Sequence, residues 1–206
     1  MNKSEKLGIK GRTDVPPRLF DLVPRFIEKY GYKDCLFAGK VDRQWAKYNG
    51  QKFYEMTNSI SHGLLKLGVK KGDRIALVAT NAPEWHMIDF AIQQVGAICI
   101  PIYPTISHAD YEYIFNHSEA SIVFVTNKHL YNKVSDVIAS TPSIKDVYLI
   151  RAAEGLKSLQ ELIELGDENR DEAALEAAKA EVKNEDVATI IYTSGTTGSA
   201  KGVVLS

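Results

Sequence analysis

The stretch Arg74-Ile-Ala-Leu-Val-Ala-Thr80 decides the fold of this 206-residue chain. The residues between Arg74 and Thr80 are all apolar. A strand with one face in water would alternate apolar and polar residues, so this run predicts a strand of a parallel sheet that is buried on both faces. Pro83 follows closely and suits the first turn of a helix. A buried strand that leads into a helix is therefore the expected centre of the fold.

The same alternation of strand and helix extends in both directions from this stretch. Further strands are predicted at 97–100, 121–125 and 146–150, with helices that begin near Ser107, Asn127 and Ser158. Asp110 and Glu161 stand at the spacing that completes a capping pair with the two serines. Upstream, apolar residues at helical spacing predict a helix from Gln51 that ends at Gly68. The predicted fold class is α/β, a mostly parallel sheet with helices on both faces.

The chain divides into three predicted parts. Residues 1–166 form an N-terminal α/β subdomain, which opens with an irregular polar arm (1–17), a helix from Leu19 to near Gly31 and two short strands (34–40 and 45–48). Residues 167–186 are rich in Ala, Glu and Lys and predict a solvated helical connector. Residues 187–206 are expected to begin the next subdomain.

Composition argues against several classes of function. The 25 Lys and Arg residues balance 26 Asp and Glu and are not interleaved with aromatic residues, so no nucleic-acid surface is predicted. The five histidines lack metal-ligand spacing with acidic partners, so no metal site is predicted. Cys35 and Cys99 are too few for a disulfide framework and are expected to be buried thiols in a reducing compartment.

No membrane-spanning or secretory segment is predicted. The polar N-terminus lacks the apolar core of a signal peptide. The longest charge-free run, around 90–109, is interrupted by Gln, Gly and Pro and makes a poor membrane span. A cytoplasmic protein is expected, with peripheral membrane contact left open and the oligomeric state not indicated.

The candidate binding residues lie in the segment Tyr192-Thr-Ser-Gly-Thr-Thr-Gly-Ser-Ala-Lys-Gly202, which follows a predicted strand at 187–192. Its hydroxyl groups can each donate to a phosphate oxygen, and they belong to Thr193, Ser194, Thr196, Thr197 and Ser199. Gly195, Gly198 and Gly202 let the backbone approach a ligand, and successive N–H groups in such a turn form an anion-binding hollow. Lys201 adds a positive charge. The pattern predicts a polyphosphate site.

Two other nucleotide-binding patterns fail on this segment. A Walker A loop needs glycine where Ala200 stands and Ser or Thr where Gly202 stands, followed by a helix. The next residues are β-branched and do not begin a helix. The Gly-x-Gly-x-x-Gly pattern of dinucleotide-binding folds is absent. A flexible Ser/Thr/Gly hairpin without a ligand is the remaining alternative.

The segment resembles the phosphate-binding signature of the adenylate-forming superfamily, although Ala200 replaces the usual proline. The resemblance covers nearly the whole chain and is closest to long-chain fatty acyl-CoA synthetases. It also rests on Trp45, Gly63–Gly68, Gly72-Asp-Arg-Ile-Ala76, Asn81-Ala-Pro-Glu-Trp85, Gly96-Ala-Ile-Cys-Ile-Pro101 and Ile102-Tyr-Pro-Thr105. It implies that the chain is the N-terminal part of the large adenylate-forming domain.

The resemblance implies ATP-dependent activation of a fatty acid, first to acyl-AMP and then to acyl-CoA, with Mg²⁺ on the triphosphate. The implied binding residues are Thr193, Ser194, Gly195, Thr196, Thr197, Gly198, Lys201 and Gly202. No catalytic residue is expected within these 206 residues, because the family's later motifs and its C-terminal lysine are expected further along the chain. The segment is therefore expected to be inactive alone.

Two alternatives stay open at this point. One is an adenylate-forming ligase for another carboxylic acid, and the other is a non-catalytic α/β module that binds a nucleotide or anion. Tyr103 and Pro104 follow a predicted strand end, where parallel sheets often place binding loops, and are secondary pocket candidates. Trp85 is expected to belong to the core.

Overall fold

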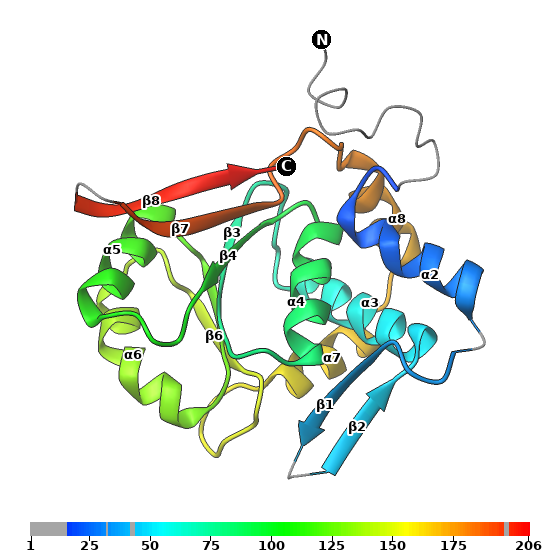
Figure 1. Ribbon diagram of the computed structural model, residues 1–206, viewed down its shortest axis with the longest axis horizontal. Helices are drawn as coiled ribbons and strands as arrows, with labels where there is room; N and C mark the ends of the chain where they lie inside the picture. The colour runs from blue at the N-terminus through cyan, green and yellow to red at the C-terminus, as the bar shows by residue number, and fades with distance from the viewer. Residues whose placement is uncertain (1–15, 32, 42–43, 196–197) are drawn as a thin grey trace.

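The computed structural model describes residues 16–31, 33–41, 44–195 and 198–206. Its centre is a six-stranded sheet in the order β6-β5-β3-β4-β7-β8 (Figure 1). The strands are β3 (Arg74–Val78), β4 (Ile98–Ile102), β5 (Ile122–Val125), β6 (Asp146–Leu149), β7 (Thr189–Gly195) and β8 (Gly198–Leu205). All neighbours are parallel except β7 and β8. The predicted fold class, a mostly parallel α/β sheet, is confirmed.

Helices cover both faces of this sheet. The first face packs against α3 (Gly50–Lys66), α4 (Pro83–Gln94) and α7 (Leu159–Glu168), and the second against α5 (His108–Ser118) and α6 (Lys128–Ser140). Alternate residues of β3 enter the two cores: Ile75 and Leu77 enter the first, and Ala76 and Val78 enter the second. All four side chains are fully buried, which explains why the run is apolar without interruption.

Local signals in the sequence place the helix starts correctly. Ser107 and Ser158 both form complete capping boxes with the residue three positions on. The Asn127 side chain accepts a hydrogen bond from the backbone N–H of Leu130 at 3.0 Å. Gly68, with a φ of 82°, follows α3 in a left-handed conformation that favours glycine.

The N-terminal region lies beside the helices that cover the first face of the sheet, here called the first helical layer. It consists of η1 (Leu19–Asp21), α2 (Leu22–Tyr30) and a separate antiparallel ribbon of β1 (Phe37–Val41) and β2 (Gln44–Tyr48). The predicted helix and both short strands are present. The predicted arm at 1–17 lies almost entirely outside the described residues. No helix in the described parts of the chain combines the length and apolar character needed to cross a membrane.

The predicted connector at 167–186 contains α8 (Glu172–Glu181). Most of its side chains are exposed, but Leu175 and Lys179 are buried. After α8 the chain enters the same sheet, where the Cys99 N–H donates to the carbonyl of Ala188 at 3.1 Å. The division into subdomains at this connector stays a prediction.

The two cysteines differ in environment. Cys99 on β4 is buried, as predicted, whereas Cys35 is exposed. The prediction of a buried thiol is wrong for Cys35 because it lies just before the β1–β2 ribbon, outside the helical layers that cover the sheet.

Two glycines allow α3 and α7 to approach closely. A Cβ atom added at Gly166 would lie 1.9 Å from the Ser59 carbonyl oxygen, and one added at Gly63 would lie 2.5 Å from the Leu162 carbonyl oxygen. Both obstacles are backbone atoms, which move only if a helix moves. The spacing of the first helical layer therefore depends on the absence of side chains at these positions.

Gly166→Ala is expected to destabilise the chain by at least about 2 kcal/mol, because overpacking outweighs the gain of about 1 kcal/mol in helix propensity. Urea unfolding measures the effect. Glu164→Ala, at an exposed position of the same helix, is the control and should change stability by less than about 0.5 kcal/mol. A stabilising Gly166→Ala would show that the two helices are not in this close contact.

A carboxylate lies between α4 and β4. Asp89 accepts hydrogen bonds from the side chains of Gln93 and Cys99, but burial dominates and raises its pKa. Burial, followed by the nearby Asp89 charge, also raises the pKa of the Cys99 thiol, which therefore stays protonated and unreactive. The folded chain holds the Asp89 proton more tightly than the unfolded chain does.

Stability from Asp89 is therefore present at low pH and is lost as the pH rises through its folded pKa. We expect Asp89→Asn to become progressively more stable than the parent between pH 4 and pH 7. The measurement is the difference in free energy of unfolding at each pH, with the exposed Glu112→Gln as the control for loss of a carboxylate. A difference that does not change with pH would contradict this assignment.

Candidate functional site

The predicted phosphate loop is an antiparallel hairpin made by β7 and β8. Tyr192 pairs with Gly202 and Thr193 pairs with Lys201, and the register shifts between Thr193 and Gly195. The expected loop from Thr193 to Gly202 is therefore largely strand, because cross-strand pairing satisfies its backbone groups. The backbone of the segment is thus a hairpin, which is the backbone form named in the sequence analysis as the alternative to a loop.

Two of the predicted ligand groups meet on this hairpin. Thr193 and Lys201 are directly opposite each other, so their side chains share one face, and both are exposed. A hydroxyl donor beside an ammonium group suits an anion. The backbones of Ser194, Gly195 and Gly198 lie within β7 and β8, but the side chain of Ser194 lies outside the described residues, as do Thr196 and Thr197.

Gly202 has a packing role that the sequence did not reveal. Its φ lies outside the positive range, so it does not use the left-handed conformation that favours glycine. A Cβ atom at this position would lie 2.8 Å from Cγ2 of Ile190 and 3.5 Å from the Tyr192 ring. The missing side chain therefore gives the Ile190 side chain room, whereas the distance to the Tyr192 ring is an ordinary van der Waals contact.

Tyr192 anchors the hairpin to α5. Its hydroxyl lies 2.7 Å from Nδ1 of His117, within hydrogen-bond distance. Its ring stands edge-on to the rings of Tyr113 and His117, with centroids 6.3 and 5.7 Å apart. Burial, and then the neighbouring Tyr113, raise the pKa of Tyr192, so its hydroxyl remains protonated at neutral pH. Sequence reasoning gave His117 no such role, since 75 residues separate it from Tyr192.

The secondary candidates occupy different surroundings. The Tyr103 side chain is 76% exposed, and its carbonyl accepts from the Tyr111 hydroxyl at 3.2 Å. Lys133 Nζ donates to the Pro104 carbonyl at 3.1 Å and so holds this loop against α6.

Trp85 is partly buried and packs against the first core, in line with its predicted core role. Within the described residues, no cluster of His, Cys, Asp or Glu could hold a metal ion.

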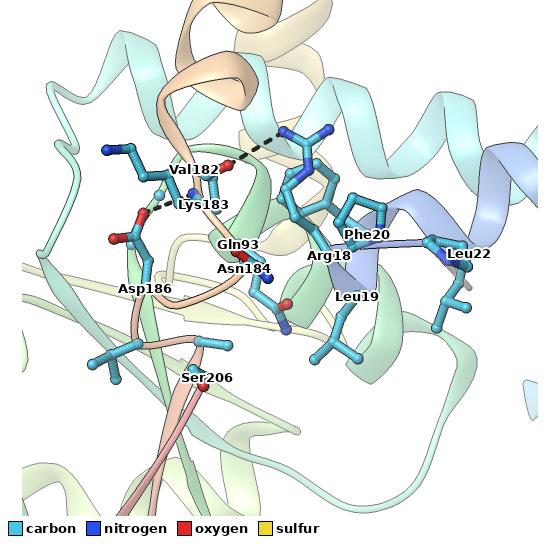
Figure 2. Close-up of a pocket in the computed structure, with 16 residues that line it drawn as sticks. Arg18, Leu19, Phe20, Leu22, Gln93, Val182, Lys183, Asn184, Asp186 and Ser206 are labelled. Atoms are coloured by element: carbon cyan, nitrogen blue, oxygen red, sulfur yellow. Dashed lines mark hydrogen bonds between the residues drawn. The ribbon is translucent and has the colours of Figure 1, made fainter. Parts of the chain in front are cut away.

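A cavity of about 250 Å³ lies at the base of the hairpin (Figure 2). It is lined by η1, the end of α4 and the segment between α8 and β7, and includes Leu19, Phe20, Val187 and Ser206. Val187 precedes β7 and Ser206 follows β8, whereas Thr193 and Lys201 lie toward the other end of the strands. The cavity is therefore separate from Thr193 and Lys201, which are both exposed.

Comparisons with known proteins agree with this fold. The family of AMP-binding enzymes matches residues 24–206. The chain belongs to the AMP-binding enzyme family. It is 35% identical over 171 residues to the long-chain-fatty-acid–CoA ligase FadD15 of Mycobacterium bovis, covering 83% of this chain and 28% of that protein. It is 29% identical to ACSBG1, a ligase with the same description from Rattus norvegicus, covering 94% of this chain and 27% of that one.

Solved structures of two CoA ligases share the fold. A long-chain-fatty-acid–CoA ligase (FadD1) from Archaeoglobus fulgidus matches with a TM-score of 0.73 and 29% identity, over 91% of this chain and 36% of that one. The anthranilate CoA ligase AuaEII matches with a TM-score of 0.77 at 22% identity, over 93% of this chain and 35% of that one, which shows the fold alone. The chain spans just over a quarter of the length of these curated relatives.

Tyr192→Phe is expected to lower the free energy of unfolding by about 1 kcal/mol, the usual net value of one lost hydrogen bond. Hydrogen exchange at β7 and β8 should become faster, because the hairpin loses its polar contact with α5. Tyr103→Phe removes an exposed hydroxyl and should change stability by less than about 0.5 kcal/mol. Equal effects of the two substitutions would rule out an anchoring role for Tyr192.

Proposed function

We propose that the intact protein is an ATP-dependent acid–thiol ligase that activates a long-chain fatty acid, and that the β7–β8 hairpin holds the phosphates of ATP. The observation that carries the proposal is the cross-strand pair of Thr193 and Lys201, exposed on one face within the family's signature segment. A hydroxyl and a fixed positive charge side by side can both bind a polyphosphate.

In this proposal the remaining signature residues complete the phosphate site. Ser194, Thr196 and Thr197 donate hydroxyl groups to the β- and γ-phosphates, and Gly195 and Gly198 let backbone N–H groups approach. Gly202 contributes through the room it gives Ile190 on the paired strand. Mg²⁺ binds on the triphosphate oxygens, a mode this cation favours over all-protein cages.

Catalysis of this reaction depends mainly on positioning the substrates and stabilising charge. A carboxylate attacks the α-phosphate, acyl-AMP forms and pyrophosphate leaves. The CoA thiolate then attacks the acyl carbon and AMP leaves. Lys201 and the hydroxyl groups offset the charge that builds on the departing pyrophosphate. The Tyr192 contact with α5 holds these groups in place relative to the sheet.

The substrate class rests on the relatives. The curated proteins quoted above are long-chain-fatty-acid–CoA ligases. We therefore propose a fatty acid, ATP and CoA as substrates, with a cytoplasmic or membrane-peripheral location. Because this chain matches just over a quarter of those relatives, we infer that it supplies part of the active site and is inactive alone.

Lys201→Ala in the intact protein is expected to lower kcat/KM for ATP by about tenfold to a hundredfold, the usual cost of one charged hydrogen bond. The assay is pyrophosphate release with palmitate, ATP and Mg²⁺, followed by acyl-CoA formation on addition of CoA. Lys145→Ala, an exposed lysine away from the hairpin, is the control and should leave the rate unchanged.

The same assay separates the remaining alternatives. Pyrophosphate release with benzoate or a short-chain acid, but not with palmitate, would assign another carboxylic acid as substrate. Binding of ATP without pyrophosphate release on any acid would favour a non-catalytic module. An unchanged rate for Lys201→Ala would exclude the proposed role of the hairpin. The 206-residue chain alone should release no pyrophosphate.

A further inference from the structure

The β1–β2 ribbon carries an unusual outward surface, here called the ribbon face and made of Ala38, Lys40, Trp45 and Lys47. Lys40 pairs with Trp45 and Ala38 pairs with Lys47, so the four side chains share one side of the ribbon. All four are exposed, and the Trp45 side chain is 65% exposed. Lys40 Nζ lies 5.3 Å from the centroid of the Trp45 ring, at cation–π distance.

The opposite side of the ribbon is fixed to the body of the protein. The Phe37 ring stacks on Phe53 of α3 with centroids 4.6 Å apart. A Cβ atom at Gly39 would lie 2.6 Å from Cδ of Pro83 at the start of α4. Tyr48 is buried. The ribbon face is therefore held outward, and Figure 1 shows the ribbon at the edge of the molecule, away from the β7–β8 hairpin.

The charge around the ribbon differs from that of the whole chain. Among the described residues 33–41 and 44–52 there are four basic residues (Lys33, Lys40, Lys47 and Lys52) and one acidic residue (Asp34), whereas the whole chain has a net charge of -1. A basic surface attracts anionic lipid headgroups. Tryptophan suits the boundary between water and lipid, because one end of its ring system is apolar and the other carries an N–H donor.

We propose that the ribbon face docks on the surface of an anionic lipid bilayer, with Trp45 entering the headgroup region and Lys40 and Lys47 contacting lipid phosphates. The charge complementarity and the exposed tryptophan between two lysines favour a bilayer over a protein partner. This contact involves neither ATP nor the hairpin, so it stands apart from the proposed ligase reaction and can be tested without it.

The test is sedimentation of the purified 206-residue chain with vesicles of phosphatidylcholine alone or mixed equally with phosphatidylglycerol, at low salt and without ATP. We expect binding to the anionic vesicles only. Removing one lysine charge should weaken binding about fivefold. The double variant Lys40→Glu with Lys47→Glu should therefore weaken binding at least about tenfold. Trp45→Ala should also weaken binding at least about tenfold. Lys145→Glu and Tyr103→Ala are controls for charge and exposed aromatic area and should bind as the parent does.

Fluorescence gives a second measurement. The chain has two tryptophans, so Trp85→Phe leaves Trp45 as the sole reporter. Its emission should shift to shorter wavelength on anionic vesicles and be quenched by lipids brominated near the headgroup. Thermal melting of each variant confirms that it is folded.

Three outcomes would overturn the proposal. They are no binding to anionic vesicles, binding that Trp45→Ala and the lysine variants leave unchanged, and equal binding to both kinds of vesicle. Self-association that Trp45→Ala abolishes, with no vesicle binding, would also overturn it and would assign the ribbon face to a second copy of the chain. Absence of the proposed ligase activity in the intact protein would not contradict the ribbon-face proposal, because vesicle binding is measured without ATP.

Discussion

Burial of β3 on both faces is the constraint on which the rest of the structure depends. Its side chains alternate between two cores, so neither face of the sheet can remain in water. Each parallel neighbour needs a crossover, and the crossover helices supply the required cover. The close approach of α3 and α7 through Gly63 and Gly166 then sets how the first helical layer packs against that face.

The signature hairpin takes its position from this body. β7 joins the sheet beside β4, and Tyr192 reaches across to His117 on α5. The exposed pair of Thr193 and Lys201 therefore belongs to a hairpin whose strand β7 is attached to the body at two places. A phosphate site benefits from such support, because donors held in place before the reaction need little rearrangement during it.

Features set by neighbouring residues could be predicted from the sequence. The buried strands, the capping boxes at Ser107 and Ser158 and the helix end at Gly68 each depend on a few consecutive residues. Features set by distant contacts could not. The contact of Tyr192 with His117 and the clash that keeps Gly166 a glycine join elements far apart in the chain. The exposure of Cys35 likewise depends on which helices cover the ribbon.

The pairing of β7 with β4 has a consequence for the order of assembly. The two strands meet through Cys99 and Ala188, about ninety residues apart, and most of the intervening chain forms β5, β6 and four helices. Closing so long an interval as a flexible loop is entropically costly, and the cost is far smaller once those elements have folded. We therefore expect the hairpin to dock on a sheet that already exists and the signature segment to be among the last parts of the chain to acquire its structure.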